Sequence, residues 1–220
     1  RIMIRIINLF FIIFFLLSSK AYSLIEIDIT RGNLDPLPIA VSPLFQDDNS
    51  KRNSFNELKI ENVGSEISLV VENNLKISGL FNPLSKEAFL QKPDIAHLKP
   101  RFEDWALIKA QALITGKVTI EDKKLKVEFR LWDILAGREM MALAFTTVPS
   151  NWRRVGHIIS DKVYERLTGE KGYFDTRIIY VSEEGPKTAR VKKLAIMDQD
   201  GFNTKYLTLG NELVLTPRFN

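Results

Sequence analysis

The stretch that decides the fold is Ala112–Thr147, ALITGKVTIEDKKLKVEFRLWDILAGREMMALAFTT. Its middle run alternates apolar with charged or polar side chains, which is the two-residue period of a half-buried strand. A further apolar run lies on either side of it, and short polar turns separate the three. Runs arranged in this way predict an antiparallel meander with strands over Ala112–Ile120, Leu125–Leu131 and Met140–Thr147.

A helical pattern flanks the meander on each side. Ile60–Leu75 and Asn151–Leu167 place apolar residues three or four positions apart, as expected of helices that pack one face on a sheet. Gly79 and Gly169 follow these patterns closely, as helix ends prefer. The two apolar stripes are Val63, Ile67, Val70, Val71 and Leu75, and then Trp152, Val155, Ile159, Val163 and Leu167.

Two further elements complete the amino-terminal unit. A short helix is predicted over Phe102–Lys109, and a strand over Leu37–Val41, where the prolines favour a sheet edge or the start of a strand. Strands and helices mixed in this order predict an α/β amino-terminal domain, with helices on a mixed sheet, over residues 24–170.

The sequence pattern changes after Gly172. Short runs with strand character lie at Arg177–Val181, Val191–Met197 and Lys205–Leu209, and the Asp-Gly pair at 200–201 is a strong hairpin signal. Such spacing is typical of a β-propeller blade. A blade buries its faces only against neighbouring blades. We therefore expect residues 171–220 to be the first blade of a propeller whose other blades lie beyond this sequence.

Residues 1–23 have the order of a secretory signal peptide. Two arginines accompany the apolar run Ile6–Leu17, which is shorter than the roughly 20 residues of a membrane span. The small residues Ala21 and Ser23 precede a predicted cleavage between Ser23 and Leu24. We expect export to the periplasm, with no stable membrane insertion after cleavage.

Charge and cysteine content exclude several function classes. The formal net charge is +4, and the basic residues Arg1, Arg5 and Lys20 lie in the predicted signal peptide, which leaves the mature part at +1. This balance gives no field to attract nucleic acid. The sequence contains no cysteine, so a disulfide framework, a thiolate metal site and a cysteine nucleophile are excluded.

The sequence contains no phosphate loop, no GxSxG and no HExxH. We expect His97 in a loop and His157 on the face of the second long helix, and neither has a supporting nucleophile motif. Asp198 and Asp200 resemble the middle of a calcium loop, but both end positions of that loop lack carboxylates. We interpret this segment as a hairpin turn.

The remaining candidates also favour structural roles. Glu103 and Asp104 are adjacent on a predicted helix and point in different directions, so we expect a solvated face rather than an acid–base pair. Trp152 lies on the apolar stripe and is expected in the core. Trp132 falls on the polar side of its strand, where it would cover an interdomain contact or meet a partner. No catalytic, cofactor-binding or metal-binding residue is predicted.

The mature amino terminus, Leu24–Thr30 (LIEIDIT), alternates strictly between isoleucine and polar residues. This pattern predicts a half-buried strand. A period-two segment at a free chain end either pairs with its own sheet or adds a strand to the edge of another protein. The residues alone leave both alternatives open.

Five stretches share a distinctive order and spacing: Leu24–Val41 (LIEIDITRGNLDPLPIAV), Ser78–Leu84 (SGLFNPL), Asp161–Arg177 (DKVYERLTGEKGYFDTR), Met197–Gly201 (MDQDG) and Leu215–Phe219 (LTPRF). Together they resemble the TolB family of the Tol–Pal system. They correspond to its mature start, the strand after its first helix, the helix and linker before its propeller, a turn of the first blade, and a blade-closing Ser-Pro stretch, which is Thr-Pro here. The resemblance covers essentially the whole chain.

The resemblance implies a six-bladed propeller and a non-enzymatic periplasmic adaptor without a cofactor. Members of the family bind Pal chiefly through the propeller and TolA through the mature amino-terminal segment, which is docked or released according to Pal binding. They support outer-membrane integrity and constriction at cell division. Glu26 and Asp28 depart from the commonest pattern, so partner affinity does not follow. The implied TolA segment comprises Leu24, Ile25, Glu26, Ile27, Asp28, Ile29, Thr30 and Arg31.

Two other function classes remain open. An exported peptidase, whose propeller gates a later hydrolase domain, would show a GxSxG elbow with Asp and His partners downstream of Asn220. A glycan- or solute-binding module would show a pocket with convergent polar groups.

Overall fold

The computed structural model describes residues 25–28, 35–46, 60–210 and 217–219. The predicted signal peptide, its cleavage site at Ser23–Leu24 and residues 29–31 of the predicted TolA segment lie outside these ranges. Among the described residues, no helix combines the length and the apolar character that a membrane crossing requires.

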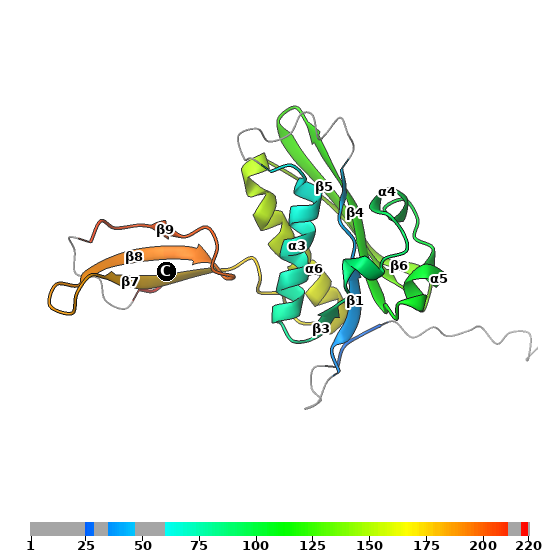
Figure 1. Ribbon diagram of the computed structural model, residues 1–220, viewed down its shortest axis with the longest axis horizontal. Coiled ribbons are helices and arrows are strands. Elements are labelled where there is room, and N and C mark those ends of the chain that lie inside the picture. Colours follow the sequence, from blue (N-terminus) through cyan, green and yellow to red (C-terminus); the bar gives the residue numbers. More distant parts are fainter. Residues whose placement is uncertain (1–24, 29–34, 47–59, 211–216, 220) are drawn as a thin grey trace, which may run out of the picture.

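A mixed sheet forms the centre of the amino-terminal part (Figure 1). The strand order is β3-β1-β4-β5-β6, and β2 pairs with β4 beside β1. The β1, β2 and β3 pairings are parallel, whereas β4, β5 and β6 form the predicted antiparallel meander. The strands are β1 (Leu37–Val41), β2 (Phe45–Gln46), β3 (Phe81–Pro83), β4 (Ala112–Glu121), β5 (Lys124–Asp133) and β6 (Arg138–Thr147).

Two long helices, α3 (Val63–Ile77) and α6 (Trp152–Thr168), cover one face of this sheet (Figure 1). The structure confirms both predicted helices and buries their apolar stripes, apart from Trp152, which is half-buried at the edge of the same core. α3 begins later than expected because Asn62 caps it, its Oδ1 accepting a hydrogen bond of 2.9 Å from the Ser65 N–H. Gly169 ends α6 in the left-handed conformation, at φ 75°.

Short helices cover part of the other face. They are α4 (Pro93–Ala96), α5 (Phe102–Leu107) and the 3₁₀ turn Lys86–Ala88, while a second 3₁₀ turn, Pro149–Asn151, leads into α6. A second buried cluster lies beneath α4 and α5, and its larger members are Leu113, Trp105, Trp132 and Ile134. The sheet is therefore apolar on both faces at this end.

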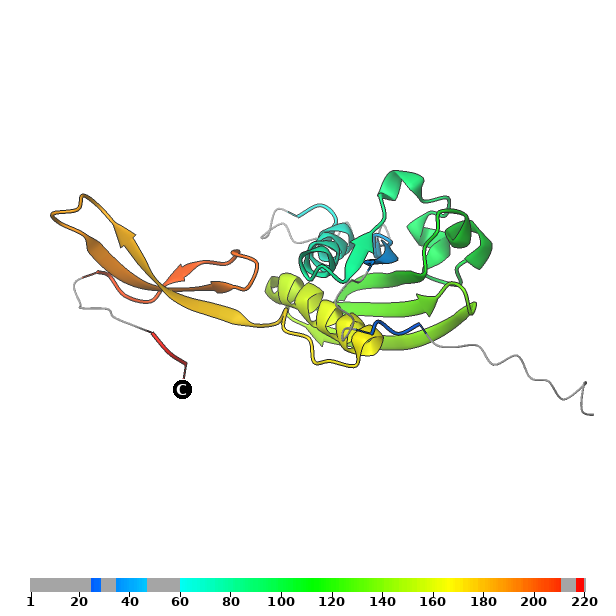
Figure 2. The same cartoon turned by 90° about the horizontal axis from the view of Figure 1, so that it is seen from below.

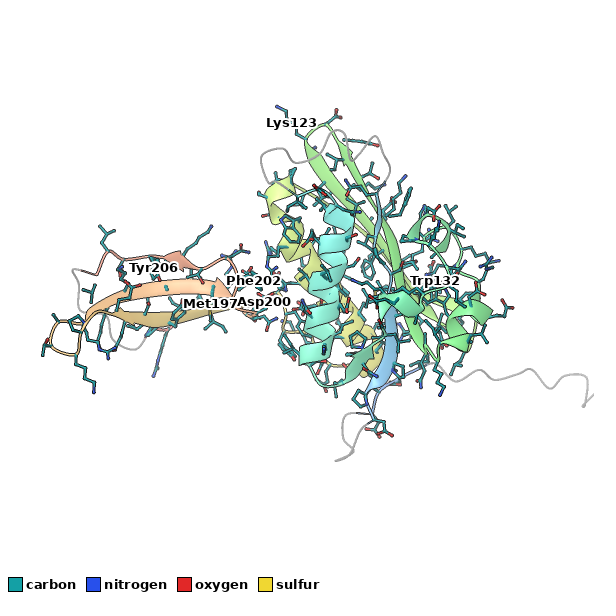
Figure 3. The ribbon with its side chains drawn as sticks, in the orientation of Figure 1. Lys123, Trp132, Met197, Asp200, Phe202 and Tyr206 are labelled. Carbon is teal, nitrogen blue, oxygen red and sulfur yellow. The ribbon has the colours of Figure 1, made fainter. Side chains whose placement is uncertain are left out.

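This second core corrects the interpretation of Trp132. The side chain is only 7% exposed, its Nε1–H donates to Thr115 Oγ1 at 2.9 Å, and its ring meets Phe102 edge to face. Trp132 lies on the side of the sheet away from the second sheet of the chain (Figure 3), and among the described residues it covers no interdomain contact. The β5–β6 register shifts between Leu131 and Trp132, and the polar side of β5 becomes buried there.

Of the two positions that the prolines favoured for β1, the sheet edge was wrong, whereas the start of the strand holds, because Pro38 is the second residue of β1. β1 lies between β3 and β4 rather than at an edge. The carbonyl of Pro38 accepts a hydrogen bond from the N–H of Gln111, just before β4 begins, so this side of Pro38 faces the residues that precede β4. On that side no β4 residue stands opposite the missing N–H of the proline, so no ladder hydrogen bond is lost.

After α6, the chain leaves the domain and forms a second, three-stranded antiparallel sheet (Figures 1 and 2). Its strands are β7 (Arg177–Glu184), β8 (Val191–Asp198) and β9 (Lys205–Tyr206), and the predicted Asp-Gly turn joins β8 to β9. Asp161 of α6 holds the connection, because its carboxylate accepts from the N–H groups of Phe174 and Asp175 at 2.6 and 3.1 Å. Phe174 is fully buried.

Candidate binding segment and hairpin cluster

The amino-terminal segment docks on the carboxy-terminal end of α6. The N–H of Ile27 donates to the carbonyl oxygen of Leu167 at 2.7 Å, and the side chains of Ile25 and Ile27 pack against the main core. Glu26 and Asp28 are exposed. The predicted alternation of buried and exposed side chains is therefore present in residues 25–28.

The predicted strand is absent from these four residues. Residues 25–28 join neither sheet. The period-two pattern identifies an extended chain with one apolar side, but it does not specify what that side meets. Here it meets the end of a helix, whose last carbonyl groups have no partner within the helix, and Ile27 supplies a donor to one of them.

A second contact joins the start of α6 to the turn between β8 and β9. Its polar residues come from α3, α6 and the turn, and we call them the hairpin cluster: Asn74, Arg153, His157, Asp198, Gln199 and Asp200. Asp200 and Phe202 lie where the second sheet faces the two long helices (Figure 3). The cluster brings together residues up to 125 positions apart in the sequence.

Arg153 is the cation of the hairpin cluster. Its guanidinium pairs with Asp200 through Nη2 and approaches Asp198 through Nε at 3.8 Å. It also lies over the Phe202 ring, 3.9 Å from the ring centroid. Its side chain is only 13% exposed, so these ion pairs are shielded from water more than a surface pair would be. The next residue, Arg154, makes a more exposed pair with Asp175.

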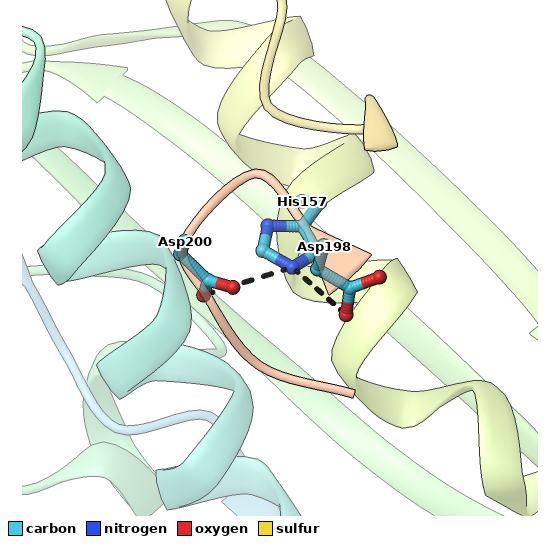
Figure 4. Close-up of side chains that lie close together, drawn as sticks. All are labelled: His157, Asp198 and Asp200. Atoms are coloured by element: carbon cyan, nitrogen blue, oxygen red, sulfur yellow. Dashed lines mark ion pairs between the residues drawn. The ribbon is translucent and has the colours of Figure 1, made fainter. Parts of the chain in front are cut away.

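His157 is buried at the centre of the hairpin cluster, with 2% of its surface exposed. Its Nδ1 lies 2.9 Å from Asn74 Nδ2. Its Nε2 makes no hydrogen bond and lies 3.9 Å from an oxygen of Asp198 and 3.9 Å from an oxygen of Asp200 (Figure 4). Burial lowers the pKa of His157 below 6.5, against the opposing effect of Asp200 and with the assistance of Arg153.

A pocket of about 230 Å³ opens beside the hairpin cluster. Its lining is strongly charged and includes Arg153, Arg154, Asp175, Arg177, Asp198 and Lys205. Most of these charges already have partners: Arg154 of α6 pairs with Asp175 of the connection, and Arg177 lies 4.0 Å from Asp198 on the neighbouring strand of the second sheet. Most charges of the lining are therefore already used in ion pairs within the chain.

Among the described residues, one group has the donor set of a metal site: His157, Asp198 and Asp200. Two observations oppose a cation there. The guanidinium of Arg153 already contacts both carboxylates, and the hydrogen bond at Nδ1 places the imidazole proton on Nε2, the nitrogen that would have to bind the metal. The two carboxylates are therefore partners of Arg153, with the neutral imidazole of His157 beside them.

The other candidates from the sequence lie apart from this cluster. His97 ends α4 and stacks on Phe45 at 4.6 Å between ring centroids. Asp104 pairs with Arg101 on the surface, and Glu103 is exposed, as expected. Sequence reasoning missed Arg153 and Asn74 as partners of the turn. A polar Asn74 inside the predicted helix beside the apolar Leu75 was the available signal.

Comparisons with known proteins agree with this architecture. The model of the TolB amino-terminal domain matches residues 25–140, and the model of the TolB β-propeller domain matches residues 164–220. The chain belongs to the TolB family. Its three-stranded sheet is the start of a β-propeller.

Two relatives give the extent of the similarity. It is 79% identical over 210 residues to the Tol-Pal system protein TolB of Pelagibacter ubique (strain HTCC1062), a match that covers 96% of this chain and 47% of the relative. The crystal structure of TolB from Acinetobacter baumannii superposes with a TM-score of 0.67 at 24% identity, covering 83% of this chain and 41% of that one. The chain thus spans about half the length of these relatives.

Proposed function

We propose that this protein is a non-enzymatic periplasmic adaptor of the Tol–Pal system, which links TolA to Pal and so supports outer-membrane integrity and constriction at cell division. The observation that carries the proposal is the docking of residues 25–28 outside the sheet. These residues are bound through half-buried isoleucines and the hydrogen bond from Ile27 to Leu167.

A segment docked in this way can be released from the domain at little structural cost. Removing a strand from a sheet breaks a whole hydrogen-bonded ladder, whereas releasing residues 25–28 leaves every strand pairing of the domain in place. The released backbone groups and the isoleucine side would then be available to a partner's sheet edge. In our proposal, Leu24–Arg31 is this TolA-binding segment, and docked and released forms compete.

The position of α6 supports a link between the two partners. Its first turns contact the propeller hairpin through Arg153 and His157, and its last turn accepts the hydrogen bond from Ile27. A change at the propeller, where we propose that Pal binds, therefore bears on the same helix that holds the terminal segment. We assign residues 24–170 to the amino-terminal domain and residues 171–220 to the first blade.

Calorimetric titration of the TolA carboxy-terminal domain with a synthetic Leu24–Asp35 peptide tests the proposal. We expect saturable binding that is lost when Ile25 and Ile27 are both replaced by Asp, because a charge buried in an interface without a counter-ion is costly. A peptide with Glu26→Gln is the matched control, since it removes a charge without touching the isoleucines.

The same titration with the full-length mature protein, with and without the segment, completes the test. Binding that needs the segment supports the adaptor. If the peptide fails to bind, and the full-length protein binds TolA equally well without the segment, Leu24–Arg31 is not the TolA-binding segment and the proposal fails at that point.

A further inference from the structure

The hairpin cluster contains a group that the proposed adaptor function does not use, the buried imidazole of His157. It stands between the two parts of the chain, with α3 on one side and the β8–β9 turn on the other. Its only described ring hydrogen bond is with Asn74, which in turn accepts a hydrogen bond from Gln199 of the turn, Nε2 to Oδ1 at 3.1 Å. Hydrogen bonds thus connect the imidazole of His157, through the amide of Asn74, to Gln199 of the β8–β9 turn.

The neighbours of Asn74 fix the protonation of this ring. Ser160 Oγ donates its proton to the Gly156 carbonyl at 2.8 Å, so it accepts from Asn74 Nδ2, which lies 3.0 Å away. Nδ2 is therefore the amide nitrogen, and it donates to Nδ1 of His157 as well. Because Nδ1 accepts, the single proton of the neutral ring is on Nε2, which faces the two carboxylates (Figure 4).

A second proton has no suitable place on this ring. It would have to bind Nδ1, where it would confront the N–H of Asn74, donor against donor. Among the charged groups that face the ring, Arg153 of α6 opposes the positive form, while Asp200 and Asp198 of the second sheet and its turn, and Asp175 of the connection before β7, favour it; burial outweighs these carboxylates and keeps the pKa of the ring low. Arg154, Arg177 and Lys205 line the adjoining pocket and add positive charge. The neighbour from α3 is the uncharged Asn74.

We propose that His157 is an acid-sensitive latch between the amino-terminal domain and the first propeller blade. With one proton, the ring accepts from Asn74 and keeps that amide turned toward Gln199. A second proton forces the Asn74 amide to turn or move away, and the link to Gln199 is lost. Acid therefore opens the contact between the helices and the β8–β9 turn.

The direction follows from linkage. Burial holds the pKa of His157 in the closed contact below its ordinary 6.5, so the open form binds the proton more tightly. Above pH 6.5 the ring is neutral in both forms, and the closed form is fully favoured. As the pH falls from 6.5 through the lower pKa of His157 in the closed form, the open form gains the proton first and the closed form loses this stabilisation. Each unit of pKa difference changes the ratio of open to closed molecules by about tenfold.

The test uses the full-length protein and two readouts. First, NMR titration of the histidine rings measures the pKa of His157 and its tautomer. Second, spin labels on cysteines introduced at Lys76 of α3 and Lys187 of the β7–β8 turn, both exposed, report the distance across the contact at pH 7.5 and pH 5. The 220 residues contain no cysteine of their own, which leaves these positions free of competing sites in this part.

We expect the ring to titrate below 6.5 with its neutral proton on Nε2, and a second label distance to appear at pH 5. His157→Gln cannot titrate, and its side-chain carbonyl can still accept from Asn74, so its label distance should be the same at both pH values. The matched control is His97→Gln, which removes the other histidine of this sequence and should behave like the wild type.

Three results would overturn the latch. They are a His157 pKa at or above 6.5, a wild-type label distance that does not change with pH, and the same change in His157→Gln as in the wild type. If the glutamine variant does not fold, the wild-type titration and label distances still decide the question. A contact that tightens in acid would mean that the imidazolium pairs with Asp198 and Asp200 instead.

Discussion

At the residue scale, Gly156 determines how closely the two long helices approach each other. A methyl group at this position would lie 2.8 Å from Val70 Cγ1 and 3.4 Å from the Ile67 carbonyl oxygen. Gly156 also lies one residue before His157 and carries the carbonyl that Ser160 uses to orient Asn74. The approach of α6 to α3 therefore sets the geometry of the hairpin cluster.

We expect Gly156→Ala to destabilise the protein, although alanine is the better helix former by up to about 1 kcal/mol. The added methyl would force α3 and α6 apart, at a typical cost of about 1–3 kcal/mol for an overpacked core. Urea unfolding measures the difference. Glu165→Ala, at an exposed position of the same helix, is the control and should change stability little. A more stable Gly156→Ala protein would show that the helix crossing tolerates the methyl group.

At the element scale, the docked terminus and the hairpin cluster use opposite ends of α6 for physical reasons. The last turn of a helix has unpaired carbonyl groups, and an extended segment with a free N–H supplies a donor to them. The first turns carry Arg153 and His157 on the side that meets the β8–β9 turn. One rigid element thus serves two contacts.

We expect Ile27→Asp to weaken the docking of the terminal segment. The side chain packs against the main core, where a carboxylate would lose hydration without gaining a counter-ion. Limited proteolysis of the full-length mature protein should then cleave the terminus faster, with the domain itself intact. Glu26→Gln, at an exposed position, should leave the rate unchanged. Equal protease sensitivity of the wild type and Ile27→Asp would contradict docking through this side chain.

At the scale of the whole molecule, two neighbouring arginines of α6 pair with carboxylates of the segment that follows this helix and should differ in importance. The side chain of Arg153 is 13% exposed, whereas that of Arg154 is 59% exposed. Removing one partner of a buried pair leaves the other charge uncompensated and typically costs about 3–5 kcal/mol, while an exposed pair contributes about 0–1 kcal/mol.

We therefore expect Arg153→Met to loosen the contact between the amino-terminal domain and the first blade far more than Arg154→Met. Calorimetric melting of the full-length protein should show a lower transition temperature for Arg153→Met and a nearly unchanged one for Arg154→Met. In Arg153→Met, the pKa of His157 should also rise, because the charge of Arg153 is one cause of its lowering. Equal melting of the two variants would contradict the role assigned to Arg153.

The sequence by itself determined the main elements of this protein and their order. The meander strands, both long helices, Gly169 as the end of α6 and the Asp-Gly hairpin all follow from local periodicity and turn chemistry, which are written in neighbouring residues. The family resemblance extended this to the propeller. These features were predictable because each depends on side chains within a few positions of one another.

Only the tertiary structure decided what those elements meet. Residues 25–28 dock on a helix end rather than in a sheet, Pro38 lies in an interior strand, and Trp132 is buried under α5. The hairpin cluster joins Asn74 to Gln199, 125 residues apart. Periodicity reports that one side of a segment is buried, but the partner comes from a distant part of the chain, so it is fixed only when the long-range packing is in place.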